Sequence, residues 1–145
     1  GTERIANTQP SDEGCPMAIA TSTDSAYVTQ ISSGGFDFTS DTTWADRGGE
    51  TAPTPHDLLD ASLAACIAMT VRIAADARQT ALDRVTVEVI NDDENPASSS
   101  FHCTVTLEGD LSEKERAGLL RVAHACPISK LLSKTIEIGI SEASS

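Results

Sequence analysis

The sequence predicts an α+β protein in which a mainly antiparallel sheet wraps around one long buried helix. Three observations support this prediction. Segments that alternate polar and apolar residues come in pairs, which is the pattern of β-hairpins. Helical segments separate these pairs along the chain, an order that is typical of the α+β class. One of the helical segments is apolar or small nearly all round, as expected of a helix at the centre of a fold.

The first predicted hairpin follows a polar N-terminal segment. Residues 1–25 are rich in Thr, Ser, Asp and Asn, and we expect them to form an extended polar arm. Because the chain has 145 residues, close to the ~150 of an average domain, residues 26–145 are expected to form a single domain. Within it, strands over 26–31 and 36–39 flank Gly34-Gly35, a pair that favours a tight hairpin turn because both residues tolerate positive φ.

A second hairpin and a terminal strand are predicted further along the chain. Valines alternate with polar residues over 85–90, and a similar pattern over 101–108 predicts the partner strand after a polar loop. At the C-terminal end, Ile136, Ile138 and Ile140 alternate with other residues, which predicts a last strand. These strands complete the predicted sheet.

Three helices are predicted between and after the hairpins. The longest begins at Thr54-Pro55, where Thr is a good N-cap and Pro suits the first helical position, and it ends near Arg78. Its middle, residues 61–69, is apolar or small on all sides, so we expect this helix to be buried on most of its surface. A capping-box sequence starts a helix over 112–125, and a short helix over 127–132 follows.

Composition excludes several classes of function. The chain has 10 Lys and Arg against 22 Asp and Glu, a formal net charge of −12. Such acidity argues against nucleic acid and against anionic membrane surfaces as partners, because both require clustered cations. The longest charge-free hydrophobic stretch, residues 61–71, is shorter than the ~18 residues of a membrane span. No secretory signal is visible, so we expect a cytoplasmic protein.

Two of the four cysteines are candidates for chemistry. Cys66 lies in the apolar middle of the long helix, and Cys126 precedes Pro127 at the start of another. A sulfur at a helix N-terminus lies near free backbone N–H groups and the positive end of the dipole, which favour the thiolate. A buried cysteine is also a common small hydrophobic residue. The residues alone therefore leave a structural and a chemical interpretation open.

Two segments of the sequence resemble the cysteine motifs of the OsmC/Ohr family. The first is residues 53–66, in which a proline, paired leucines and a run of small residues end in Cys66. The second comprises residues 107–112 and 119–128 and includes the Cys126-Pro127 pair. The order of the motifs, the hairpin between them and the terminal Ile-x-Ile segment all agree with the family. The resemblance covers residues 26–140.

This resemblance implies a fold, an assembly and an activity. Members of the family are intertwined homodimers with two active sites at the subunit interface. They reduce hydroperoxides, organic ones especially, as a defence against oxidative stress. The resemblance implies that Cys66 attacks the peroxide and that Cys126 resolves the product to a disulfide. It implies no metal, flavin or haem, only an external dithiol or lipoyl-type reductant.

The chain departs from the peroxidase pattern at two charged positions. Family peroxidases have a Glu ten residues before the first cysteine, where this chain has His56. They also use an Arg from the N-terminal hairpin, whereas residues 27–40 contain none. The candidates to replace these charges are His56 itself, Glu50, Arg47 and Arg72. An imidazolium near Cys66 would favour the thiolate.

Two alternative functions follow from the same residues. One is an OsmC-fold protein without efficient peroxidase turnover, which binds a small ligand or senses redox state. The other is zinc binding by His56, Cys66, His124 and Cys126, which are suitable ligand types. Cys103 is expected to be a packed core residue, because strand alternation places it on the face opposite to His102. The fourth cysteine, Cys15, is expected to be exposed in the polar arm.

Overall fold

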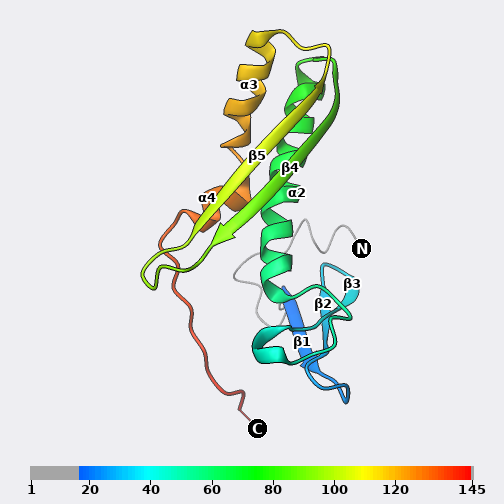
Figure 1. Ribbon diagram of the computed structural model, residues 1–145, viewed down its shortest axis with the longest axis vertical. Coiled ribbons are helices and arrows are strands. Elements are labelled where there is room, and N and C mark those ends of the chain that lie inside the picture. The colour runs from blue at the N-terminus through cyan, green and yellow to red at the C-terminus, as the bar shows by residue number, and fades with distance from the viewer. Residues whose placement is uncertain (1–16, 145) are drawn as a thin grey trace. The chain divides into compact units, whose positions relative to one another are not determined.

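The computed structural model describes residues 17–144, and its chain forms two compact units. One unit ends at Leu58 and the other begins at Leu59. Strands β1 to β3 belong to the first unit, and strands β4 and β5 with helices α3 and α4 belong to the second (Figure 1). Most of the predicted polar arm, with Cys15, lies outside the described residues.

The first unit contains an antiparallel sheet with strand order β1-β2-β3. Its strands are β1 (Ala18–Ser22), β2 (Thr29–Ser33) and β3 (Phe36–Ser40). The predicted hairpin is confirmed: Gly34 and Gly35 connect β2 to β3 with φ angles of 61° and 85°. Strand β1 was not predicted, because its five residues are all exposed and fall within the polar segment. The sheet therefore has one strand more than the sequence indicated.

After β3, a loop is organised around the carboxylate of Asp41, whose residue is only 2% exposed. This carboxylate accepts hydrogen bonds from the backbone N–H groups of Thr51, Thr42 and Gly49 and from the Thr51 hydroxyl, at 2.8–3.1 Å. These bonds lower the pKa of Asp41 to about 2, against the opposing effect of burial. Gly48, with φ +79°, passes so close that a Cβ there would lie 1.9 Å from the Thr42 carbonyl oxygen. A short 3-10 turn, η1 (Trp44–Asp46), lies within this loop.

We predict that Asp41→Asn destabilises the first unit and removes part of its acid sensitivity. A carboxyl group whose pKa is lowered stabilises the fold above its unfolded pKa, and this contribution is lost as the pH falls through the folded value. The native protein should therefore lose stability between about pH 4 and pH 2. Thermal unfolding across this range should show a smaller loss for the variant. The exposed Asp37→Asn is the control, and equal pH dependence of native protein and Asp41→Asn would contradict the prediction.

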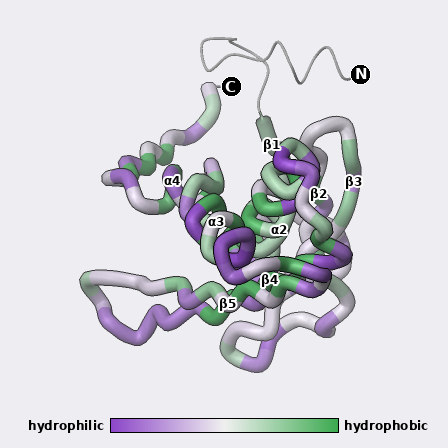
Figure 2. The backbone as a smooth tube through the Cα atoms, turned by 90° about the horizontal axis from the view of Figure 1, so that it is seen from above, coloured by the Kyte–Doolittle hydropathy of each residue, from purple (hydrophilic) through white to green (hydrophobic). Residues whose placement is uncertain are grey.

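In the second unit, two helices cover one face of an antiparallel hairpin (Figures 1 and 2). The hairpin consists of β4 (Leu82–Asp92) and β5 (Ser100–Gly109), with Val87 opposite Val105. Helix α2 (Pro55–Ala77) begins in the first unit and continues through the second. Helices α3 (Glu113–Ala123) and α4 (Pro127–Leu132) follow the hairpin. Figure 2 shows that hydrophobic residues gather where α2 meets the two strands.

The helix starts are those that the sequence predicted. The Thr54 hydroxyl accepts a hydrogen bond from the Asp57 N–H at 3.1 Å, and the Asp57 carboxylate accepts one from the Thr54 N–H at 3.0 Å. Ser112 and Glu115 form the same reciprocal arrangement at the start of α3. Such capping boxes satisfy N–H groups that have no partner within the helix. Local side-chain chemistry therefore defines where both helices begin.

The core of the second unit depends on one stripe of α2. Leu63, Ile67, Val71 and Ala75 recur every four residues and are buried. They pack with residues of the hairpin, with α3 and with the loop before α4. Within the single chain α2 is less buried than the sequence indicated: the stripe is buried, and the residues beside it are half-buried. The opposite side is open: Met69 is 63% exposed and Ile73 is 67% exposed. The buried members of the core are Leu63, Ile67, Val71, Ala75, Leu82, Leu107, Leu119 and Cys126.

Helix α2 also meets a criterion for membrane-spanning helices. By length and composition alone, it is long and apolar enough to cross a bilayer, with a mean hydropathy of 1.7 over its best window. Core helices of soluble proteins meet the same criterion, so this is weak evidence for a span. The burial of its Leu63–Ala75 stripe against a hairpin gives α2 the role of a core helix.

The predicted terminal strand is not formed. Residues 135–144 contain neither helix nor strand, and Ile138 and Ile140 are 81% and 94% exposed. A strand exists only when a neighbouring strand takes up its backbone hydrogen bonds. Among residues 17–144 no strand pairs with this segment, so alternation alone was not sufficient.

Two adjacent leucines on α3 test the assignment of the core. Leu119 is 1% exposed and Leu120 is 43% exposed. We predict that Leu119→Ala lowers the free energy of unfolding by about 2–5 kcal/mol, because it leaves a cavity in the core. Leu120→Ala is the matched control and should cost about 1 kcal/mol or less. Denaturant unfolding measures both, and equal losses would contradict the assignment.

Candidate functional site

The two candidate thiols meet in the second unit, although they are sixty positions apart in the sequence. Cys66 lies on α2 next to the buried stripe, and Cys126 is the N-cap residue of α4. The Cys126 thiol lies close enough to the sulfur of Cys66 to act as a hydrogen-bond donor that lowers the pKa of Cys66. Both are free thiols. Cys126 is placed there because α3 ends at Ala123 and Pro127 starts a new helix.

The hydrogen bonds around Cys66 make it the more acidic of the two thiols. Burial acts to raise the pKa of Cys66, but the Cys126 thiol and the backbone N–H of Ile128 outweigh it and lower the pKa below its ordinary 9.0. The Thr70 hydroxyl lies close enough to contribute as well. It already donates to the backbone carbonyl of Cys66 at 2.7 Å, so we assign the effect mainly to the other two donors.

Cys126 has the opposite character. Burial raises its pKa, and a charged Cys66 raises it further, although the N–H groups of Ser129 and Ile128 oppose this. The Ser129 N–H donates to the Cys126 sulfur at 3.5 Å. Cys126 has no exposed surface, whereas Cys66 is partly exposed. The pair therefore consists of an accessible sulfur that favours the thiolate and a buried sulfur that favours the thiol.

Arg72 does not reach this pair of thiols. Its guanidinium forms a salt bridge with Asp76 at 2.9 Å and donates to the Leu82 carbonyl oxygen at 2.8 Å. Its charge and donors are thus used to join α2 to β4. No Lys, Arg or His of the described chain is among the groups that shift the pKa of Cys66. Neutral hydrogen-bond donors lower the pKa of Cys66 instead.

The other three charged candidates lie in the first unit. His56 is in the first turn of α2, and Glu50 lies in the Asp41 loop with a positive φ of 55°. Arg47 lies in the same loop, with its guanidinium carbon 5.9 Å from the ring centre of Tyr27 and 5.7 Å from that of Trp44. Such distances are those of cation–π contacts. The exposed Trp44 therefore has a structural partner within its own unit.

The structure also shows where Cys103, His102 and the apolar residues of α2 lie. Cys103 faces the core from β5, as predicted, and burial raises its pKa. His102 lies on the exposed face of the same strand. Leu63 and Ile67 belong to the buried core of the second unit. Met69 lines a hollow of about 470 Å³ with Ile73 and five other residues of α2 and β4.

Zinc binding finds no support in the described chain. Within residues 17–144, no group of three or more His, Cys, Asp and Glu side chains is close enough to hold a metal ion. A structural zinc site needs about four such ligands. The hydrogen-bonded pair Cys66 and Cys126 provides two.

Sequence reasoning missed the donors that surround the sulfurs. Thr70 follows Cys66 by one helical turn, a spacing that places both on one face and was readable from the sequence. Ile128 and Ser129 follow Pro127 in the first turn of α4, where backbone N–H groups have no helical partner. The signal for these donors was the Cys-Pro start itself. The Ser129 N–H donates to Cys126 itself, and that the Ile128 N–H also reaches Cys66 depends on tertiary packing.

Comparison with protein families identifies the class of this protein. Residues 48–141 match the model of the OsmC family, described as OsmC-like protein. The match covers both cysteines and more than half of the chain, and the chain belongs to this family. A search of curated proteins finds no match.

Solved structures share the same fold at low sequence identity. A putative osmotic stress induced and detoxification response protein from Psychrobacter arcticus is 24% identical, with a TM-score of 0.69 over 82% of this chain and 89% of that one. An OsmC-like protein from Mycoplasma pneumoniae is 20% identical, with a TM-score of 0.64 over 79% and 84%. An organic hydroperoxide resistance protein OsmC from Legionella pneumophila is 22% identical, with a TM-score of 0.58 over 80% and 87%. These likenesses confirm the predicted α+β, OsmC-like fold.

The hydrogen bond between the thiols can be tested through the acidity of Cys66. We predict that Cys66 is alkylated by iodoacetamide with a pH midpoint below 9.0. Cys126→Ala removes a donor and should raise this midpoint, because the thiolate loses a hydrogen bond. Cys126→Ser keeps a donor and is the matched control. Mass spectrometry of the Cys66 peptide measures the rate, and an unchanged midpoint in Cys126→Ala would refute the role of this bond.

Proposed function

We propose that this protein reduces organic hydroperoxides by a two-cysteine mechanism, with Cys66 as the peroxidatic and Cys126 as the resolving residue. The observation that supports this best is the asymmetry of the pair. The accessible sulfur is the more acidic one, and its buried neighbour is held as a thiol within hydrogen-bonding contact. A peroxidatic cysteine must be a thiolate that substrate can reach. Its resolving partner needs only to reach the first sulfur.

The proposed reaction has three steps. The Cys66 thiolate attacks the terminal oxygen of ROOH, the O–O bond breaks, and RO⁻ takes up a proton and leaves as the alcohol. Cys66 becomes a sulfenic acid, and the Cys126 sulfur displaces its hydroxyl as water to form a disulfide. An external dithiol then reduces the disulfide by thiol exchange and is itself oxidised. Cys66 and Cys126 supply all the protein sulfur atoms that these steps require.

Family relationships support the choice of substrate. The OsmC fold is shared with proteins named organic hydroperoxide resistance proteins from Legionella pneumophila and Bacillus subtilis. We propose oxidative-stress defence in the cytoplasm, with a dithiol or lipoyl-type molecule as reductant. Neither a metal nor an organic cofactor is needed for the steps above.

The proposed assembly is a homodimer with the active sites at the subunit interface. Met69 and Ile73, both on α2, are each more than 60% exposed. Large apolar patches on an isolated chain are typical of protein interfaces. A second copy would cover the open side of α2. The same interface could supply the cation that the Cys66 site does not have among its own described groups.

One observation favours a second candidate function. The groups that lower the pKa of Cys66 are neutral donors, Arg72 is engaged by Asp76, and His56 replaces a glutamate of the family peroxidases. A thiol pair with no cation acting on it among the described residues suits slow redox sensing or small-ligand binding on the same fold. Turnover distinguishes this candidate from the peroxidase, because a sensor forms the disulfide once without rapid cycling.

Peroxide consumption tests the proposed reaction. We predict multiple turnovers of cumene hydroperoxide by the native protein with dihydrolipoamide, and none by Cys66→Ser. Cys126→Ser should consume about one equivalent per chain and leave a sulfenic acid at Cys66, because no resolving thiol remains. Cys103→Ser is the matched control and should behave as the native protein. Full activity in Cys66→Ser would exclude the mechanism, and a single slow turnover by the native protein would favour the sensor.

A further inference from the structure

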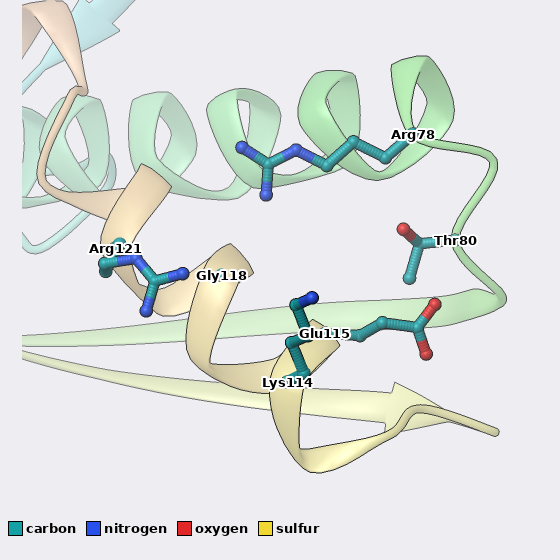
Figure 3. A pocket seen from close by; sticks show the side chains of 6 residues that line it. All are labelled: Arg78, Thr80, Lys114, Glu115, Gly118 and Arg121. Carbon is teal, nitrogen blue, oxygen red and sulfur yellow. The ribbon is translucent and has the colours of Figure 1, made fainter.

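A hollow of about 290 Å³ on the second unit collects positive charge, away from the two thiols. It lies between the C-terminal end of α2 and the helix α3 (Figure 3). Arg78 follows α2 directly, and Lys114 and Arg121 belong to α3. Three of the chain's ten basic residues therefore meet at one place on a protein of net charge −12. The lining residues are Arg78, Thr80, Lys114, Glu115, Gly118 and Arg121.

The two guanidinium groups approach the same point above Gly118. From the position that a Cβ would take on Gly118, Arg78 Nη1 lies 3.1 Å away and Arg121 Nη2 lies 3.7 Å away. Figure 3 shows the two side chains extending toward one another from different helices, with the Lys114 ammonium directed into the same space. Like charges at such separations repel each other. An anion bound between the two guanidinium groups would attract both and offset their mutual repulsion.

Carboxylates of the described chain do not neutralise this cluster. Within residues 17–144, none of the three cations forms a salt bridge. Glu115 lines the hollow, but its Oε1 atom accepts the Ser112 N–H at 2.9 Å in the capping box. Its carboxylate points away from the two guanidinium groups (Figure 3). The positive charge is thus available to a ligand.

Gly118 shapes the floor of the hollow. It is buried in the middle of α3, where glycine costs about 1 kcal/mol relative to alanine. A methyl group at this position would lie in tight contact with Arg78, so the missing side chain leaves the space in which both guanidinium groups lie. Gly118, a poor helix former, therefore lies in α3 at the point where the cations converge.

We propose that this hollow, formed by Arg78, Lys114 and Arg121 around Gly118, binds the phosphate groups of a small phosphorylated molecule. Two guanidinium groups offer paired N–H donors that match the tetrahedral oxygens of phosphate, and the ammonium adds a point charge. The Thr80 hydroxyl lies at the rim as a neutral donor. The volume accommodates one or two phosphate groups with part of the attached molecule. This site is separate from the thiol pair, and it does not depend on the peroxidase proposal.

Isothermal titration with pyrophosphate tests the site on the full-length protein. The native protein should bind pyrophosphate saturably with a stoichiometry of one per chain, and more tightly than orthophosphate or the dicarboxylate succinate. Arg78→Gln combined with Arg121→Gln should weaken binding by about tenfold or more, because each charge-assisted hydrogen bond contributes strongly. Gly118→Ala should also weaken binding, although alanine favours the helix. Arg84→Gln, an exposed arginine of β4 outside the hollow, should leave the affinity within about twofold of the native value.

Loss of affinity in Gly118→Ala, with unfolding temperature kept or raised, separates a binding role from a structural one. Absence of saturable binding to the native protein would overturn the site. So would equal affinity in the double variant and the native protein, or an equal response in Arg84→Gln and the double variant. Succinate binding as tight as that of pyrophosphate would refute the phosphate specificity.

Discussion

Helix α2 packs one apolar stripe against the β4–β5 hairpin, and the placement of both sulfurs follows from this contact. Leu63, Ile67, Val71 and Ala75 fix the rotation of the helix about its axis. Cys66 is adjacent to Ile67 and therefore lies at the edge of the buried stripe, where it is only partly covered. The same core encloses Cys126 completely. The chemistry of the pair is thus a consequence of packing, because the burial of one sulfur and the exposure of the other are set together.

The acidity of Cys66 arises without a cation of the described chain. The Cys126 thiol and the Ile128 N–H oppose the effect of burial, and the net result is a lowered pKa. This arrangement couples the acidity of Cys66 to the presence of the Cys126 thiol. In the proposed reaction, a disulfide between the two sulfurs removes both the acidic thiol and its donor. Reduction of that disulfide would restore the two thiols together.

Local signals predicted the starts of helices α2 and α3 and the β4–β5 hairpin. The capping sequences at Thr54 and Ser112 and the alternation in β4 and β5 depend on neighbouring residues, and the structure confirms them. Tertiary contacts determined the elements that the sequence did not predict correctly. Ile136, Ile138 and Ile140 alternate but have no partner strand among the described residues, and β1 pairs with β2 despite a polar sequence. For the candidate site, the sequence motifs indicated Cys66 and Cys126 as candidates, whereas the contact of Arg72 with the Leu82 carbonyl oxygen depends on the turn from α2 into β4.

Mapping the disulfide formed with one equivalent of organic hydroperoxide tests the central claim most directly. The account predicts the loss of two titratable thiols per chain and a single intramolecular link between the Cys66 and Cys126 peptides. Non-reducing peptide mass spectrometry identifies this link. A disulfide that involves Cys15 or Cys103, or an oxidised Cys66 with Cys126 still a free thiol, would contradict the account.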